Sequence, residues 1–553
     1  MSILKKIKEE KLIKTDNAKL IIGNVWTKIS GSIPKKVINE IDDELSYFVQ
    51  GAQFSKAYRD KNWDGFKRFL VKQSLFPTGF LNDVCKIIKK NKIKVIKKDT
   101  RKKYEISEEE IIRIISTNKK ITARKYQVKA VIRIINKQSG VANLPTGTGK
   151  TEIINLVIFV LDTYTKKKLK YLVISGGISL LSQLKESIGN FQNEKIGFIG
   201  SGIKEIKRIT VGSVDSLYPH SIKKFKKYGK NSKTFKIDNE IQDLLQTVNV
   251  VFLDEAHHSP ADTFRSVLNS ATNASFRIGT TATYERADGE DMLLRAVTGS
   301  IIYKKSLSWM IEKGYLANPI IILFTYNGAE LKEKKGDTWK DSYKDGVSQN
   351  KHRNILISNI NKILIDKKLS SVLFVEQLNQ GQDITKHMIN NLRVDKNSIS
   401  FLTGKSNLTL RKQVLNNFSS GEIRTIVCTK ILNEGIDFPE ANAGIKASGM
   451  KFEGTIKQQL GRILRKKKNK FAKDIDRKES QNVFWIDICD VHSSILANHS
   501  LKRIKVYESE PIFKVIYVSS LNELKDAIND NIKKTKIIKD RKNSSDKKNS
   551  SNK

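Results

Sequence analysis

The sequence predicts an α/β protein with two tandem parallel-sheet domains, a small α+β domain in front of them and a disordered basic tail. Apolar runs typical of strands alternate with helical patterns across residues 106–325, and again across 351–532. Residues 1–105 mix short apolar runs with lysine clusters, which favours an accessory domain that binds DNA. Residues 533–553 contain only Lys, Asn, Ser, Thr, Asp, Arg and Ile, so they cannot bury a core.

The expected strands are short, apolar and separated by helical segments, which is the pattern of a parallel sheet built from βαβ units. In the first large domain we expect strands at 140–144, 171–175, 208–213, 248–253 and 277–280. In the second we expect them at 371–375, 399–402, 425–428, 443–447 and 483–488. The stretch 326–350 between the domains is rich in Lys, Asp and Gly, and we interpret it as a linker or an exposed insertion.

The charge balance predicts an anionic partner. Lys and Arg number 101 against 58 acidic residues, a formal charge of +43, so nucleic acid is the leading candidate and an acidic membrane surface the alternative. No apolar stretch reaches the roughly 18 residues of a membrane span. The start, MSILKKIKEEKL, has no apolar signal region, and Cys85, Cys428 and Cys489 show no paired spacing. We expect a soluble, intracellular protein, in the cytoplasm or nucleoid, or at a site of viral replication.

The strongest local motif is a glycine-rich turn between an expected strand and an expected helix. It reads Leu144-Pro145-Thr146-Gly147-Thr148-Gly149-Lys150-Thr151. Backbone N–H groups of such a turn bind phosphate, Lys150 would reach the β- and γ-phosphates, and the Thr151 hydroxyl would ligate Mg²⁺. The strict pattern has Gly where Leu144 stands, so the motif is a variant, and the alternative is a glycine-rich turn without function.

A second motif places two carboxylates after an apolar strand. Asp254 and Glu255 follow residues 250–253, and the carboxyl ends of parallel strands are where ligands bind. Asp254 could hold Mg²⁺ through water, and Glu255 could orient and deprotonate an attacking water. A solvated strand end is the alternative interpretation.

Together these motifs resemble the DEAH-box-type core of superfamily 2 helicases and translocases, over residues 123–465. The resemblance implies two RecA-like domains that use ATP and Mg²⁺ and bind DNA. Arg124 and Gln127 resemble the Q-motif of that superfamily, which implies a preference for adenine. Residues 210–217 resemble a strand-end motif that contacts the nucleic-acid backbone, and residues 280–283 resemble the motif that couples the ATP site to the track.

The second domain carries the remaining motifs of the resemblance. Residues 429–437 resemble motif V, which implies nucleotide contacts at Gly435 and Asp437, and residues 458–465 resemble motif VI. On a helix, Gln458, Arg462 and Arg465 would share one face, because positions three and four apart are neighbours. That face could present both guanidinium groups to a γ-phosphate. A basic surface helix is the alternative.

Short segments narrow the resemblance to the branch with XPB-type, RecG-like and restriction-enzyme motors, and most to phage recombination helicases of the UvsW type. These segments are Trp63-Asp64-Gly65, residues 76–80, residues 499–503 and Tyr507. Tyr58, Trp63 and Phe66 could stack on bases or could be core residues.

The function expected from this resemblance is ATP-dependent unwinding or branch migration of DNA forks, D-loops and R-loops in recombination, replication or repair. Three alternatives stay open. The protein could move along duplex DNA and release transcripts or RNA polymerase, it could be the motor subunit of a restriction system, or it could bind nucleic acid without catalysis. RNA in hybrids remains a further possible partner.

Overall fold

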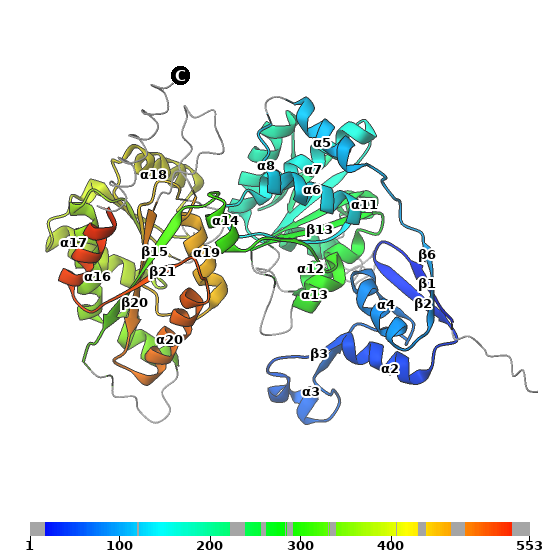
Figure 1. Ribbon diagram of the computed structural model, residues 1–553, viewed down its shortest axis with the longest axis horizontal. Coiled ribbons are helices and arrows are strands. Elements are labelled where there is room, and N and C mark those ends of the chain that lie inside the picture. The colour runs from blue at the N-terminus through cyan, green and yellow to red at the C-terminus, as the bar shows by residue number, and fades with distance from the viewer. Residues whose placement is uncertain are drawn as a thin grey trace, which may run out of the picture. The chain divides into compact units, whose positions relative to one another are not determined.

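The computed structural model describes residues 17–118, 121–221, 238–255, 261–282, 284, 291–329, 331, 339–404, 406–429, 438–465 and 482–532 (Figure 1). The described residues form two compact units. One contains the chain up to Leu144 together with Gly149–Lys304, and the other contains Pro145–Thr148 together with the chain from Lys305 onward. None of the helices in these described ranges has the length and apolar character needed to cross a bilayer.

The small N-terminal domain is built on a four-stranded sheet of order β5-β2-β1-β6. Its strands are β1 (Asn17–Ile22), β2 (Trp26–Gly31), β5 (Leu75–Pro77) and β6 (Lys94–Asp99). Buried and accessible residues alternate along β1, as expected of a strand with one face on a core. Helices α2 (Lys35–Glu44) and α4 (Leu81–Lys90) supply the other half of that core through residues such as Ile41 and Val84.

The N-terminal domain packs directly on α13 (Asp291–Thr298), a helix of the first large domain. Leu293 and Ala296 of α13 belong to the same apolar core as β1, α2 and α4. A Cβ atom at Gly79 would lie 1.9 Å from the Arg295 carbonyl oxygen, so only glycine allows this approach. The Arg295 side chain also forms an ion pair with the buried Asp83. The two domains therefore share one continuous interior.

The first large domain is an eight-stranded sheet of order β10-β9-β11-β8-β12-β13-β7-β14, parallel except for β10. Its strands are β7 (Ser139–Asn143), β8 (Tyr171–Ser175), β9 (Gly197–Gly200), β10 (Ile203–Glu205), β11 (Ile209–Ser213), β12 (Val250–Asp254), β13 (Phe276–Thr281) and β14 (Ile301–Lys304). Its helices include α5 (Glu108–Thr117), α6 (Lys125–Lys137), α7 (Lys150–Thr165), α8 (Ile178–Gln192), α9 (Val214–Leu217), α11 (Asn239–Thr247) and α12 (Ala261–Ser270). Every residue of β8, β11 and β12 is buried, because helices cover both faces of the sheet.

The second large domain is a seven-stranded, fully parallel sheet of order β17-β18-β16-β19-β20-β15-β21. Its strands are β15 (Asn318–Tyr326), β16 (Ser371–Phe374), β17 (Ile399–Leu402), β18 (Thr425–Cys428), β19 (Ala443–Lys446), β20 (Asn482–Asp490) and β21 (Lys514–Val518). Its helices include α14 (Leu307–Glu312), α15 (Trp339–Tyr343), α16 (Lys351–Asp366), α17 (Leu378–Asn390), α18 (Leu408–Ser420), α19 (Glu453–Ile463) and α20 (Ser494–Glu508).

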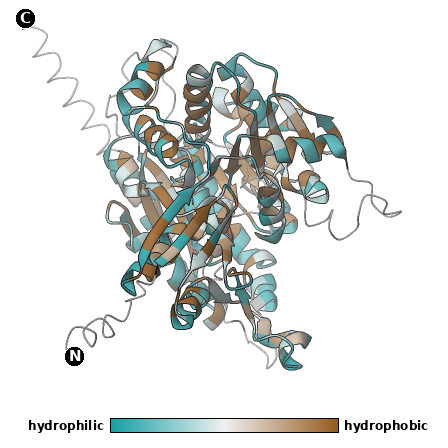
Figure 2. Cartoon of the chain, turned by 90° about the vertical axis from the view of Figure 1, so that its right-hand side faces the viewer, coloured by the Kyte–Doolittle hydropathy of each residue, from teal (hydrophilic) through white to brown (hydrophobic). Residues whose placement is uncertain are grey.

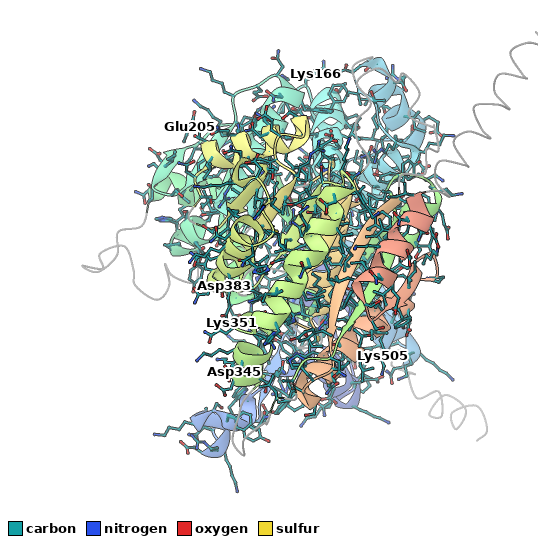
Figure 3. The ribbon with its side chains drawn as sticks, turned by 90° about the vertical axis from the view of Figure 1, so that its left-hand side faces the viewer. Lys166, Glu205, Asp345, Lys351, Asp383 and Lys505 are labelled. Carbon is teal, nitrogen blue, oxygen red and sulfur yellow. The ribbon has the colours of Figure 1, made fainter. Side chains whose placement is uncertain are left out.

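Amphipathic helices close the sheets of both large domains. In the second domain α16 and α17, which carry Lys351 and Asp383 in Figure 3, place Ile357, Ile360 and Ile384 in a common core with β16 and β20. Hydrophobic and hydrophilic residues alternate along the helical ribbons in Figure 2, as this arrangement requires. The predicted α/β class with two parallel-sheet domains and a small leading domain is confirmed.

The boundary between the large domains lies earlier than the sequence indicated. We expected the first domain to reach residue 325, but β15 pairs with β20 and β21 of the second sheet, so the first domain ends at β14.

The interpretation of residues 326–350 as a linker or exposed insertion is also partly wrong. Residues 339–348 are helical, and Tyr343 and Val347 are buried against Leu496. Only two apolar side chains, four positions apart, indicate this helical segment, and the polar composition around them favoured a linker instead.

Residues 499–507, which the sequence analysis used for the UvsW-type resemblance, contribute to a buried ionic network. The fully buried Arg503 guanidinium donates to both oxygens of Asp487, at 3.1 and 3.0 Å, and to the carbonyl of Gly449. The Tyr507 hydroxyl donates to Asp487 at 2.7 Å and accepts from Trp485. This segment, on which part of the UvsW-type resemblance rested, therefore helps to hold α20 on β20.

Replacing Arg503 by alanine should destabilise the second large domain by about 3–5 kcal/mol, because Asp487 would remain buried without its cation. Thermal unfolding followed by circular dichroism measures this effect. The exposed neighbour Lys502 provides the matched control, since Lys502→Ala removes a cation from the same helix without opening the core. Equal melting temperatures for the two variants would contradict this role for Arg503.

Candidate nucleotide site

The glycine-rich loop joins β7 to α7 and has the shape of a phosphate cradle. Gly147 and Gly149 have φ angles of +82° and +80°, a region that favours glycine. A Cβ atom at Gly149 would lie 2.7 Å from the Nε2 atom of Gln127. The Thr148 hydroxyl closes the turn by donating to the Pro145 carbonyl at 2.7 Å. Because α7 begins at Lys150, its first N–H groups point into this loop.

Lys150 and Glu255 form a close ion pair at the carboxyl edge of the first sheet. The Lys150 Nζ atom donates to Glu255 Oε1 at 2.7 Å, and the two side chains are only 9% and 16% exposed. Glu255 has a φ angle of +47°, which is uncommon for a residue with a side chain and is typical of functional turns. The turn after β12 thus brings a carboxylate to the lysine of the loop, across 105 residues of sequence.

Asp254 lies beside this pair and is 3% exposed. The hydroxyl of Thr280, on the neighbouring strand β13, donates to its Oδ1 atom at 2.5 Å. Burial, and then the negative charge of Glu255, raise the pKa of Asp254 to about 6, while Lys150 and Thr280 act in the opposite direction. A buried carboxylate held by a hydroxyl is a suitable outer ligand for a hard cation such as Mg²⁺.

These residues fit a nucleotide with its cation. The hydroxyl oxygen of Thr146 is buried and has no hydrogen-bond partner among the described residues, so the loop keeps a polar atom for a ligand. Thr151, the second residue of α7, and Asp254 would hold Mg²⁺, and the loop N–H groups with Lys150 would hold the phosphates. When bound, the cation would neutralise charge that develops between the β- and γ-phosphates.

The two Q-motif residues lie beside this loop at the start of α6. Gln127 is buried, and its Oε1 atom accepts a hydrogen bond of 2.9 Å from the backbone N–H of Arg124. Its Nε2 end faces Gly149, as the close approach above requires. Gln127 therefore contacts both the start of α6 and the phosphate loop. Recognition of adenine by Gln127 stays a prediction.

The motif VI residues lie in the second large domain, and one of them is placed differently from our expectation. Gln458 and Arg462 are buried residues of α19. The helix ends at Ile463, however, and Arg465 lies in a short β-bridge with Leu316. The idea that all three side chains share one helix face is therefore wrong for Arg465, because a periodicity argument does not reveal where a helix stops.

The tip of the phosphate loop lies against these motif VI residues, within one compact unit of the chain. A Cβ atom at Gly147 would be 2.9 Å from the Gly461 carbonyl oxygen and 3.0 Å from Cγ of Arg465. A Cβ atom at Gly461 would be 3.0 Å from Cβ of Thr146. Glycine at both positions allows this approach, and the side chain of Arg465 starts beside the loop.

Some predicted site residues lie outside the described ranges, and one contact was not foreseen. Gly435, Asp437 and Thr283 are outside the described residues. The unforeseen contact joins the loop to residues 280–283, the motif expected to couple the ATP site to the track, because the backbone N–H of Leu144 donates to the Thr281 carbonyl at 2.9 Å. The sequence contained one signal of this contact, the apolar residue Leu144 where the strict pattern has glycine. Leu144 is fully buried, as an apolar side chain at a packed contact would be.

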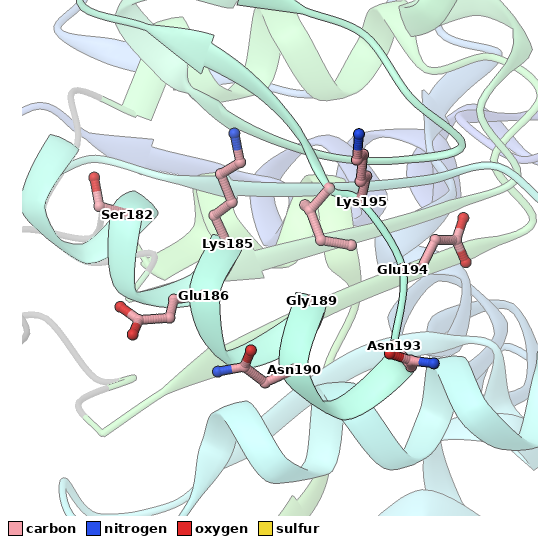
Figure 4. Close-up of a pocket in the computed structure, with 9 residues that line it drawn as sticks. Ser182, Lys185, Glu186, Gly189, Asn190, Asn193, Glu194 and Lys195 are labelled. Atoms are coloured by element: carbon pink, nitrogen blue, oxygen red, sulfur yellow. The ribbon is translucent and has the colours of Figure 1, made fainter.

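Two surface hollows on the first large domain are separate from this site. One, of about 610 Å³, runs along the end of α8 and the following turn, where Figure 4 shows Lys185, Glu186 and Asn190 around it. The other, of about 580 Å³, is lined by residues that include Arg208 and Asp243. No residue of the phosphate loop or of the carboxylate pair lines either hollow.

Replacing Gly149 by alanine should raise the KM for ATP by about tenfold or more while the fold is kept, a loss of about 1.4 kcal/mol in binding. The new methyl group would collide with Gln127 and distort the loop. Gly202→Ala is the matched control, because Gly202 has a φ angle of +79° but no atom within 4 Å of the added carbon. ATP titrations of steady-state hydrolysis measure the difference, and equal KM values would speak against a phosphate cradle.

Comparison with known proteins places these features in a family. Three family models match the chain: type III restriction enzyme, res subunit, over residues 120–286; helicase conserved C-terminal domain, over 352–467; and DNA helicase UvsW, N-terminal, over 26–97. They fall on the first large domain, the second large domain and the small domain respectively.

Individual relatives agree with these matches. The DNA 3'-5' translocase XPB2 of Sulfurisphaera tokodaii is 28% identical over 380 residues, which cover 63% of this chain and 80% of that protein. The ATP-dependent DNA helicase uvsW of Enterobacteria phage T4 is 22% identical over 503 residues, covering 86% and 94%. The solved structure of S. cerevisiae Dbp5 bound to RNA and ADP BeF3 superposes with a TM-score of 0.52 at 14% identity, over 77% of this chain and 96% of that one, and shows the shared fold.

The predicted RecA-like character of the two large domains is thus confirmed, and so is the predicted resemblance. The chain is thus an ATP-dependent helicase enzyme with superfamily 2 helicase domains, homologous to UvsW, XPB and restriction-enzyme-like helicases.

Proposed function

We propose that the protein is an ATP-dependent DNA helicase or translocase that couples hydrolysis of Mg-ATP to unwinding or branch migration of forks, D-loops or R-loops. The observation that carries the proposal is the Lys150–Glu255 ion pair, which lies beside Asp254 at the end of the phosphate loop. In this role Lys150 binds the β- and γ-phosphates, and Glu255 orients the attacking water and takes its proton. The names of the relatives XPB2 and uvsW support DNA as the track.

The second large domain supplies the charge that hydrolysis requires. Arg462 and Arg465 would stabilise the negative charge of the transferred phosphoryl group, with Gln458, Gly435 and Asp437 around the nucleotide. The two large domains would close on ATP and open again after hydrolysis. This motion would change the distance between the two surfaces, one on each domain, that bind the nucleic-acid backbone. Such a cycle moves the protein along its track.

The formal charge of +43 supports a track held mainly through its phosphates. Binding should therefore weaken steeply with salt and depend little on base sequence. The small N-terminal domain, over residues 1–105, would add a further DNA contact close to the first motor domain, because it shares an interior with α13.

The decisive experiment compares ATP hydrolysis and strand displacement on forks, Holliday junctions, R-loops, blunt duplex and RNA. We expect the branched DNA substrates to stimulate hydrolysis most and to be unwound or migrated. Stimulation by blunt duplex without strand displacement would instead identify a duplex translocase that displaces bound proteins or transcripts. Failure of every nucleic acid to stimulate hydrolysis would rule out the proposed function.

A further inference from the structure

The small domain carries an arm whose aromatic side chains are exposed. The arm, residues 46–68, consists of β3 (Ser46–Phe48) and β4 (Phe66–Arg68) with a short turn and α3 (Lys56–Arg59) between them. Phe54 is 78% exposed, the most exposed large apolar side chain in the described chain, and Phe48 and Phe66 are 41% and 40% exposed. Figure 1 shows β3 and α3 at the end of the domain away from β1, β2 and β6.

The rings of Phe48, Tyr58 and Phe66 pack against one another, and they form the fixed part of this surface. Phe48 packs edge-on against both Phe66 and Tyr58, at ring distances of 5.5 and 6.0 Å. The indole N–H of Trp63 donates to the Phe66 carbonyl at 2.8 Å. A Cβ atom at Gly65 would lie 2.3 Å from the Phe48 ring, so this ring packs directly on the backbone next to β4. The half-exposed rings of Phe48 and Phe66 are therefore fixed features of the arm, and Phe54 is exposed in the turn between their strands.

The positive charge around this face favours an anionic ligand. Residues 46–68 contain five cations against two carboxylates. One of the carboxylates, Asp64, is occupied by the Arg68 guanidinium, with contacts of 3.0 and 2.5 Å. Lys56, Arg59 and Lys61 are exposed around the rings. Exposed aromatic faces interleaved with cations are the surface on which unpaired bases stack while their phosphates are neutralised.

The arm is also fastened to the first motor domain. The Lys67 ammonium forms an ion pair of 2.7 Å with Asp262 of α12, and the Arg265 guanidinium of the same helix lies 5.8 Å from the ring of Phe69, the residue that follows the arm. Helix α12 is the first described element after the Asp254–Glu255 turn. The arm therefore contacts the helix that follows the Asp254–Glu255 turn in the described chain.

We infer that the arm binds unpaired bases of single-stranded DNA next to a duplex junction, with Phe54 and Phe66 as stacking platforms. This inference rests on the proposed function, since it assigns a substrate feature to a DNA motor. Paired bases have their faces covered by neighbours in the stack, so the arm discriminates a fork from a blunt duplex. It gives the small domain a part in recognising where strands separate.

The test measures the affinity of the full-length protein for a labelled fork and for a blunt duplex of equal length by fluorescence anisotropy. Phe54→Ala should weaken fork binding by about 5- to 150-fold, the range expected for loss of one stacked base. Blunt-duplex binding should not change, and Phe54→Trp should restore fork binding. Leu501→Ala, at a residue that is 57% exposed in the second motor domain, is the matched control and should bind the fork like wild type.

Several results would overturn the inference. Phe54→Ala could bind the fork like wild type, Phe54→Leu could restore binding without an aromatic ring, or wild type could form a dimer that Phe54→Ala abolishes. The last result would assign the surface to a second copy of the chain. Fork-stimulated ATP hydrolysis by wild type, measured in parallel, separates the two proposals: its absence rejects the DNA motor, whereas its presence with unchanged fork affinity in Phe54→Ala rejects only the stacking role.

Discussion

Replacing Lys150 by alanine should lower the nucleic-acid-stimulated kcat for ATP hydrolysis by about 10²–10³-fold, because a preorganised cation next to the phosphates is lost. Glu255→Gln should lower kcat by about 10²–10⁴-fold, since an amide cannot take the proton of the attacking water. The two variants should differ in binding. Lys150→Ala removes a phosphate ligand and should weaken ATP affinity, whereas Glu255→Gln keeps the loop and should retain it.

Steady-state hydrolysis and equilibrium binding of a fluorescent ATP analogue measure these effects. Lys129→Ala provides the matched control, because Lys129 is an exposed lysine of α6 in the same domain. Both site variants must also keep the melting temperature of wild type, so that loss of activity is not loss of fold. Normal kcat in either variant would reject the role assigned to that side chain.

Replacing Arg462 by alanine should lower kcat by about 10³–10⁵-fold, the range reported for arginine side chains that stabilise the charge of phosphoryl transfer. Arg465→Ala should act in the same direction, because its side chain starts beside Gly147 of the phosphate loop. ATP binding should change little in both variants, since the arginines act on the transition state. A large fall in kcat with constant ATP affinity is the expected signature.

Arg393→Ala is the matched control, because Arg393 is an exposed arginine of the same domain. Arg462→Lys adds a second comparison. It keeps the charge but loses the planar fork of donors, so only part of the activity should return. If Arg462→Ala hydrolysed ATP at the wild-type rate on forked DNA, the arginine would have no catalytic part.

Local patterns predicted much of the architecture and of the nucleotide site. The apolar run before Asp254 is a fully buried strand, and the turn after it brings Glu255 to Lys150, as a parallel sheet requires. Ser107 caps α5, whose first turn holds three glutamates, by accepting a hydrogen bond from the backbone N–H of Glu110. These features depend on residues close in sequence or on a general rule for sheet edges.

The features that the sequence did not reveal depend on contacts between distant segments. Arg465 leaves its helix to pair with Leu316, and β15 joins the second sheet because its partners lie more than 150 residues further along the chain. The packing of Gly79 on Arg295 gives no periodic signal. Phe54 was overlooked because a single phenylalanine in a sequence is more often a core residue than an exposed one.

We expect Lys150 and its neighbouring carboxylates to bind one side of a single nucleotide, and Arg462 and Arg465 to bind the other side. A crystal structure of the protein with ADP, beryllium fluoride, Mg²⁺ and a DNA fork tests it most directly. We expect the guanidinium groups of Arg462 and Arg465 within hydrogen-bond distance of the fluoride group that occupies the γ-phosphate position. A filled phosphate loop with both arginines turned to solvent would contradict the account.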